Sequence, residues 1–95
     1  MTDPTILVLA SLADGDKHGY AMMEDIQRFA SVRLGPGTLY GAITRLEERG
    51  WIRPVAAEDR RQPYTITALG RRQLQDQVNS LDTVVKAAQR RLKQA

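Results

Sequence analysis

The stretch LGPGTLYGAITRLEERGWI, residues 34–52, predicts a helix with a marked start, a marked end and two unlike faces. Pro36 stands at its start and Gly50 at its end, which is the usual asymmetry of proline in the first turn and glycine past the last. Apolar side chains recur at the spacing of one helix face, at Leu39, Ala42, Ile43 and Leu46. The opposite face is polar and carries Thr38, Tyr40, Gly41, Thr44 and Arg45. A helix that lies in a DNA groove presents such a face, although an ordinary amphipathic helix has the same pattern.

Two further helices are predicted before this stretch. Residues 4–14, PTILVLASLAD, are apolar on nearly every side, as in a short buried helix, and Asp3 is placed to cap it. Residues 18–30 have polar side chains on one side and an apolar stripe on the other, at Met22, Met23, Ile26, Phe29 and Ala30. Residues 31–35 then link this second helix to the third.

The pattern changes after Gly50. WIRPVAA (51–57) and PYTIT (63–67) are rich in β-branched and aromatic residues, and the polar turn EDRRQ (58–62) separates them. This arrangement predicts a β-hairpin. Pro54 and Pro63 each lack the N–H that a strand ladder needs, so at least one strand is expected to be short or at an edge.

The last segment, residues 68–95, predicts one long helix with Thr67 as its N-cap. Its apolar residues are spaced alternately four and three positions apart, the pattern of helices that pair lengthwise. These residues are Leu74, Val78, Leu81, Val85, Ala88 and Leu92. An exposed apolar stripe of that length marks an interface, and the simplest partner is a second copy of the chain. The alternative is that the helix folds back on its own domain.

The order of elements is therefore helix, helix, helix, hairpin and long helix. It predicts a mainly α protein with a small β-hairpin: a winged helix-turn-helix of three helices and a two-stranded wing, plus a long C-terminal dimerisation helix. We place the DNA-binding domain at residues 1–67 and the dimerisation helix at residues 68–95.

Residues 14–25, DGDKHGYAMMED, partly match the calcium-binding loop of EF-hands. Position 5 of that pattern is His18, where a hard cation favours oxygen, and position 12 is Asp25 rather than glutamate. Most of such a loop would also coincide with the helix predicted over residues 18–30. No metal site and no cofactor are predicted.

The composition excludes several classes of function. The 95 residues suffice for one domain and include no cysteine, so thiolate catalysis, disulfides and cysteine-based zinc sites are excluded. The chain has one histidine, no glycine-rich phosphate loop and no evident carboxylate pair, so it is not expected to be an enzyme. No apolar run is long enough to cross a membrane and no signal peptide is recognisable, which fits a cytoplasmic protein.

The net charge of +3 is unevenly distributed. Residues 26–72 carry nine arginines and four acidic residues, so the middle of the chain is basic. Arginine binds phosphates and base edges through a planar, two-pronged group. Arg60 and Arg61 lie at the tip of the predicted wing, where they suit contacts with a DNA backbone or minor groove. Glu58 and Asp59 beside them reduce the local positive charge, and a merely solvated turn has the same composition.

Several short motifs follow one another between about Ile6 and Arg72. They are Ile6-Leu7-Val8-Leu9, His18-Gly19-Tyr20, Pro36-Gly37-Thr38-Leu39-Tyr40, Arg45-Leu46-Glu47, Gly50-Trp51-Ile52, Tyr64-Thr65-Ile66-Thr67 and Gly70. Each motif is unspecific by itself, but their order and spacing together resemble the PadR family of bacterial transcriptional regulators.

The resemblance implies a winged-helix repressor that dimerises through its last helix and binds an inverted repeat in double-stranded DNA. It also implies DNA contacts by Tyr20 and residues 36–40, and a basic wing at Arg60 and Arg61. The chain departs from the family at Gly35, where many relatives have a capping serine, and at Pro63, where a basic or polar residue is common. Some relatives sense aromatic compounds in a dimer cavity. The last helix here has no aromatic residue, so no small-molecule effector is predicted.

The expected function is sequence-specific regulation of transcription by a homodimeric repressor that occludes a promoter. Base contacts are assigned to Thr38, Tyr40 and Arg45. The alternative is a winged-helix module that binds proteins and not DNA, which the acidic pair in the wing and the modest net charge favour. The full set of candidate DNA-binding residues is Tyr20, Pro36, Gly37, Thr38, Tyr40, Thr44, Arg45, Arg60 and Arg61.

Overall fold

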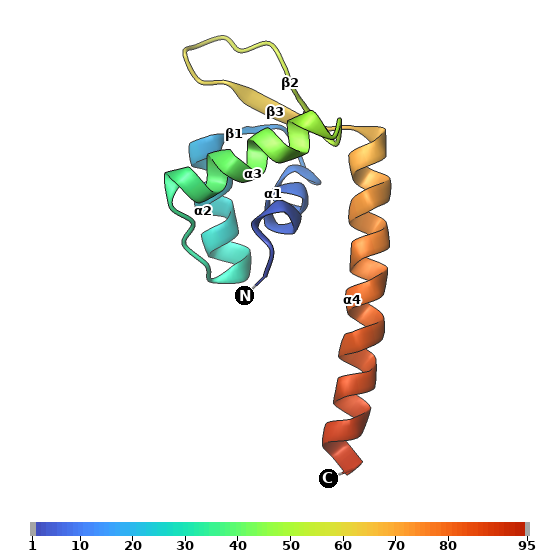
Figure 1. Cartoon of the computed structure of the whole chain (residues 1–95). Helices are drawn as coiled ribbons and strands as arrows, with labels where there is room; N and C mark the ends of the chain where they lie inside the picture. The colour runs from blue at the N-terminus through green and yellow to red at the C-terminus, as the bar shows by residue number, and fades with distance from the viewer. Residues whose placement is uncertain (1, 95) are drawn as a thin grey trace.

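The computed structural model of the chain describes residues 2–94, and these form four helices and three short strands. The mainly helical winged helix-turn-helix with a long last helix is confirmed (Figure 1). In chain order the elements are α1 (Pro4–Leu12), β1 (Lys17–His18), α2 (Gly19–Ala30), α3 (Pro36–Glu48), β2 (Ile52–Pro54), β3 (Pro63–Ile66) and α4 (Ala68–Gln94).

Helix α1 is the centre of the core. It is apolar on nearly all sides because α2, α3, α4 and β3 all pack against it. The side chain of Asp3 caps it as predicted: its Oδ1 accepts hydrogen bonds of 2.9 Å from both the backbone N–H and the hydroxyl of Thr5. The buried apolar side chains of the core are Ile6, Leu7, Val8, Leu9, Leu12, Met22, Ile26, Leu34, Leu39, Ala42, Ile43, Leu46, Ile52 and Ile66.

The sheet has three antiparallel strands in the order β1-β3-β2. The predicted two-stranded hairpin is present as β2 and β3, and a third strand, β1, was not predicted. The missed strand, β1, is two residues long and pairs Lys17 with Tyr64 and His18 with Pro63. Two residues carry no alternating pattern, and β1 is a strand only because β3 lies beside it. The prolines fit this order, since Pro63 is the first residue of the central strand and Pro54 the last residue of an edge strand.

One predicted core residue lies outside the core. Met22 and Ile26 of α2 are buried and Met23 is half-buried, but Phe29 is 50% exposed. Phe29 belongs to the last turn of α2, which ends at Ser31 in a left-handed conformation with φ of 55°. Ala30, the last residue of the predicted stripe, is half-buried and packs against the core, so Phe29 is the one member of the stripe that is exposed.

A tight junction fixes the start of α4. Thr67 caps the helix as predicted, because its hydroxyl accepts a hydrogen bond of 3.0 Å from Gly70 N–H and donates one of 2.7 Å to Gly50 carbonyl oxygen. Gly70 is buried against the carbonyl of Trp51, and a Cβ at residue 70 would overlap that oxygen and stand 2.9 Å from a side-chain carbon of Ile66. The direction of α4 is therefore set by the turn that joins α3 to β2.

From this junction α4 runs beside α1 and then past the helical body, so that the chain measures 54 × 26 × 20 Å (Figure 1). Leu74, near the start of α4, packs against the core. No helix within residues 2–94 is both long and apolar enough to cross a membrane.

Candidate nucleic-acid interface

Helix α3 presents the two faces that its sequence predicts. The apolar face is buried, with Leu39, Ala42, Ile43 and Leu46, and the polar face is open to solvent. The N-cap residue of α3 is Gly35, so the backbone N–H groups of the first turn receive no hydrogen bond from a capping side chain. Pro36, Gly37 and Thr38 in this turn are exposed. Uncapped N–H groups at a helix start favour an anionic partner.

Thr44 and Arg45 lie further along the same face and are exposed. The Thr44 hydroxyl donates a hydrogen bond of 2.9 Å to the carbonyl oxygen of Tyr40. Its hydrogen is therefore engaged, and toward a partner it acts as a hydrogen-bond acceptor. The guanidinium of Arg45 folds back along the helix, and one of its nitrogens lies 3.6 Å from the place a Cβ at Gly41 would take. This is an ordinary van der Waals distance, so the position of Arg45 does not depend on a glycine at residue 41.

A hollow of about 460 Å³ lies between the start of α2, the face of α3 and the wing. We call it the wing hollow. It brings together four of the predicted DNA-binding residues, from three separate parts of the chain, and among the described residues that line it none is acidic. Its lining residues are His18, Gly19, Tyr20, Tyr40, Arg60, Arg61, Gln62 and Tyr64.

Tyr40 crosses from α3 to the first residue of α2. A Cβ at Gly19 would stand 2.5 Å from the Tyr40 hydroxyl oxygen and 2.8 Å from the ring carbon that carries it. The ring is nevertheless 51% exposed. Tyr40 thus has one edge against α2 and the other in solvent, and Gly19 makes this position available.

The wing loop holds its shape through its own polar side chains. The carboxylate of Asp59 accepts a hydrogen bond of 2.8 Å from the backbone N–H of Arg61. At the base of the loop, the side-chain amide of Gln62 donates to the carbonyl oxygens of Val55 (2.9 Å) and Pro63 (2.7 Å). Asp59 therefore orders the backbone from which Arg61 extends.

Four residues that line the wing hollow were not among the sequence candidates: His18, Gly19, Gln62 and Tyr64. His18 is the N-cap of α2: its Nδ1 accepts a hydrogen bond of 3.3 Å from Ala21 N–H, and its Nε2 lies 3.2 Å from a guanidinium nitrogen of Arg61. Burial raises the pKa of the Tyr64 hydroxyl, and the charge of Glu47 and the Tyr40 hydroxyl raise it further, so Tyr64 keeps its proton at neutral pH. The alternation of strand side chains could have indicated Tyr64. His18 belongs to a motif quoted above, but its contact with the wing depends on a residue 43 positions away and left no local signal.

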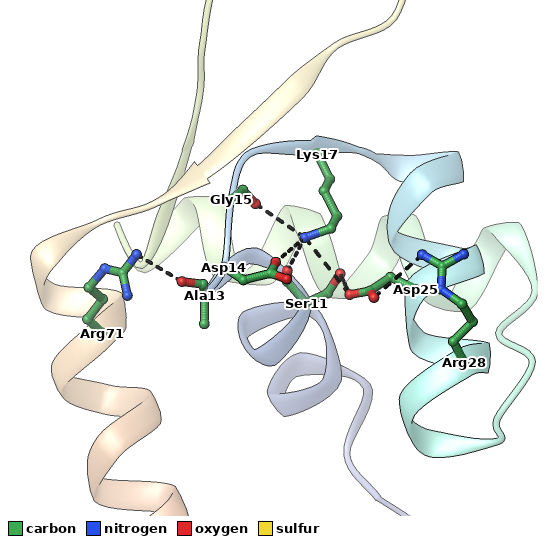
Figure 2. Close-up of polar contacts among 8 residues, drawn as sticks. All are labelled: Ser11, Ala13, Asp14, Gly15, Lys17, Asp25, Arg28 and Arg71. Carbon is green, nitrogen blue, oxygen red and sulfur yellow. Dashed lines mark hydrogen bonds and ion pairs between the residues drawn. The ribbon is translucent and has the colours of Figure 1, made fainter.

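A polar cluster around Lys17 joins β1 to α1 and α2, as Figure 2 shows. The ammonium of Lys17 donates to the carboxylate of Asp14 and to the carbonyl oxygen of Ser11 near the end of α1. Asp25 of α2 lies 3.9 Å from the same ammonium and accepts a hydrogen bond of 2.8 Å from the Ser11 hydroxyl. Lys17 thereby ties α1 to α2 and holds His18, its neighbour in β1, at the edge of the hollow.

The same cluster bears on the calcium pattern. Lys17 donates a hydrogen bond to Asp14, which lowers the pKa of that carboxyl, and the Lys17 charge adds to the effect. Residues 19–30 are helical, so they do not form a cation-binding loop. Within residues 2–94, no group of three or more histidine, aspartate or glutamate side chains is placed to hold a metal ion.

The apolar stripe of α4 is mostly uncovered. Leu74 is half-buried against the core of its own chain, but Val78, Leu81 and Val85 are 45%, 51% and 49% exposed and Leu92 is 76% exposed. Ala88 is exposed as well. Val84, which falls outside the predicted spacing, is 64% exposed and widens the stripe.

Comparison with known proteins agrees with this architecture. Residues 8–76 match the family described as the transcriptional regulator PadR-like family. A 37.1 kDa protein of transposon TN4556 in Streptomyces fradiae is 43% identical over 79 residues, which are 83% of this chain and 23% of that protein. The chain therefore spans about a quarter of the length of this curated relative.

Solved structures are similar over nearly the whole chain. A transcriptional regulator from Clostridium thermocellum has a TM-score of 0.81 and 26% identity, over 92% of this chain and 87% of that one. A PadR family transcription regulator from Clostridium difficile has a TM-score of 0.86 and 22% identity, over 96% and 99% of the two chains, which shows the shared fold. The family match covers the winged helix and the start of α4, and the chain belongs to the PadR-like family of transcriptional regulators.

Proposed function

We propose that this chain is a repressor that binds double-stranded DNA as a homodimer, at an inverted-repeat operator. The observation that carries the proposal is the wing hollow, where Tyr20, Tyr40, Arg60 and Arg61 converge beside the open start of α3. A surface that is basic, rich in hydroxyl groups and free of carboxylates among its described lining residues suits the phosphates of a nucleic acid.

In this proposal α3 enters the major groove with its first turns against the bases. Thr38, Tyr40 and Arg45 supply base contacts, each good pair being worth about 1–3 kcal/mol of discrimination. Pro36 and Gly37 let the backbone of α3 approach the DNA, and the exposed Thr44 faces the groove one turn later. The wing arginines and Tyr20 contact the phosphate backbone, which supplies most of the affinity.

The second half of the proposal is the dimer, formed by the α4 stripe of two copies. The exposed valine and leucine residues of this stripe belong to α4, and this helix runs past the helical body (Figure 1). Two-fold pairing of such helices places two α3 helices on one side of the DNA, with half-sites about 34 Å apart or a multiple of that distance. The division of the chain into residues 1–67 and 68–95 remains a prediction.

The experiment that tests the proposal is hydroxyl-radical footprinting on DNA from the region upstream of the protein's own coding sequence. The proposal expects two protected patches related by a two-fold axis and separated by about one helical turn or a multiple of it. Transcription from the same fragment in vitro should fall as the patches become protected. A protein-binding module would protect no part of the fragment.

A further inference from the structure

His18 contacts α2 and the wing at once, and it cannot form a hydrogen bond to both. A nitrogen that accepts a hydrogen bond carries no hydrogen, so when Nδ1 accepts from Ala21 N–H, the hydrogen is on Nε2. Nε2–H then lies 3.2 Å from the guanidinium of Arg61, which is also only a donor. In this tautomer two donors face one another at the rim of the wing hollow, and neither satisfies the other.

The rest of the wing hollow is rich in donors as well. The hydroxyls of Tyr20, Tyr40 and Tyr64 belong to lining residues, and Arg60 adds a second guanidinium. Tyr64 holds its proton because burial raises the pKa of its hydroxyl. The side-chain amide of Gln62 already donates to two backbone carbonyls at the base of the wing, so it is not counted among the donors available to a ligand. A ligand with several acceptor oxygens is what this set of groups lacks.

We propose that the wing hollow is a binding site for a single phosphate group, with His18 Nε2–H and the Arg61 guanidinium as paired donors to one oxygen. A phosphate oxygen placed between the two nitrogens accepts a hydrogen bond from each, so neither donor is left without an acceptor. Hydrogen bonds to a charged oxygen are stronger than those between neutral groups. His18 is thereby assigned two roles, an N-cap through Nδ1 and a phosphate donor through Nε2. If the phosphate is part of the DNA backbone, this inference rests on the proposed function and adds a contact to it. A free phosphorylated ligand would be bound by the same donors.

Two substitutions separate the roles of His18. His18→Asn places an amide oxygen near the position of Nδ1, so it keeps the cap and removes the Nε2 donor. His18→Gln places an amide nitrogen near the position of Nε2, so it keeps the donor and weakens the cap. We expect His18→Asn to bind inorganic phosphate about tenfold more weakly at nearly unchanged melting temperature, because one charge-assisted contact is lost. His18→Gln should melt at a lower temperature and keep most of the phosphate binding.

The first arm of the test follows backbone amide resonances of the full chain by NMR while inorganic phosphate is added. The proposal expects shifts concentrated at His18, Gly19 and Arg61, with saturation, and their loss in His18→Asn. Shifts spread evenly over the basic surface, or no shift at these amides, overturn it. This arm contains no DNA, so its result does not depend on the proposed function.

The second arm identifies the source of the phosphate. The affinity for a mixed-sequence duplex is measured over a range of salt concentrations for the wild type and for two variants that each remove one positive charge. If the phosphate is that of DNA, Arg61→Gln lowers the salt slope by about 0.9, the value for one lost phosphate contact, and Arg90→Gln near the end of α4 leaves it unchanged. If phosphate binds the hollow but Arg61→Gln matches Arg90→Gln, the site takes a free phosphorylated ligand, and the footprinting experiment decides the DNA-binding proposal independently.

Discussion

The hydroxyl oxygen of Tyr40 lies 2.5 Å from the position a Cβ at residue 19 would take, so helix α3 rests on the first residue of α2 through a glycine. Tyr40 is half-exposed and the contact involves only the far end of its side chain. The ring can therefore swing away if residue 19 gains a methyl group, at little cost to folding.

Gly19→Ala is accordingly expected to reduce DNA affinity without unfolding the protein. The methyl group displaces Tyr40 from the wing hollow, and with it one contact of the proposed interface, so DNA binding should weaken about tenfold. The melting temperature should stay close to that of the wild type. Fluorescence anisotropy and thermal unfolding measured on the same preparation check both statements, and a large fall in melting temperature with unchanged affinity would contradict them.

Gly70→Ala should have the opposite profile. Its Cβ would overlap the backbone carbonyl oxygen of Trp51, which cannot rotate away, so α4 must move relative to the core. We expect a loss of about 3 kcal/mol in the free energy of unfolding, measured by urea denaturation. The matched control is Gly41→Ala in the middle of α3, where a Cβ meets only Arg45 at 3.6 Å. That change should stabilise the protein by about 0.5–1 kcal/mol, because alanine is the better helix residue.

Asp3 gives the fold a predictable response to acid. The hydrogen bonds from the backbone and hydroxyl of Thr5, with smaller contributions from the charges of Arg45 and Arg49, lower the pKa of the Asp3 carboxyl below 3.8 in the folded state. The stabilisation from the charged cap is therefore complete at neutral pH. It is lost as the pH falls below about 4 and through the folded-state pKa.

Two substitutions at residue 3 test this account by urea denaturation. Asp3→Ala should lower the free energy of unfolding by about 1 kcal/mol at pH 7, the usual value of an N-cap. Asp3→Asn keeps a capping oxygen that does not titrate, so it should lose less stability than the wild type between pH 4 and pH 2. Parallel pH profiles of the wild type and Asp3→Asn would show that the Asp3 cap contributes nothing to acid sensitivity.

A charge introduced into the α4 stripe should leave the folding of the single chain unaffected but weaken the proposed dimer. Val85 is 49% exposed in the chain itself, so Val85→Glu should leave the fold intact while placing a carboxylate in the proposed interface. Sedimentation equilibrium should show a shift from dimer towards monomer. Asn79→Glu adds the same charge on the opposite side of α4 and should remain dimeric. Equal behaviour of the two variants would exclude pairing through this stripe.

The helices were predictable from the sequence because each carries its own local signals. Asp3 and Thr67 cap their helices as expected, and the apolar residues of α3 are all buried. Strand β1 was not predictable, because two residues have no pattern and their pairing depends on β3, more than forty positions later. Phe29 has the spacing of a core residue but is 50% exposed, and spacing alone does not reveal which side chains the rest of the fold covers.

The sequence indicated many of the residues of the candidate site, but it did not reveal how they are arranged. Motif positions indicated Tyr20, Tyr40 and the wing arginines, and the structure brings these together. Thr38 and Arg45 stay on the open face of α3, outside the wing hollow. The part of His18 in the site could not be predicted, because it arises from one contact to α2 and another to the wing that only the folded chain creates.

The central claim, that the face of α3 and the wing bind DNA, is tested most directly by fluorescence anisotropy with DNA from the protein's own upstream region and with scrambled DNA, at two salt concentrations. We predict tighter binding to the upstream fragment and a steep loss of affinity as salt rises. In the double variant Arg60→Gln/Arg61→Gln the salt slope should fall by about 1.8, for two lost phosphate contacts. Equal, weak binding of both DNA fragments, unchanged in the double variant, would contradict the account.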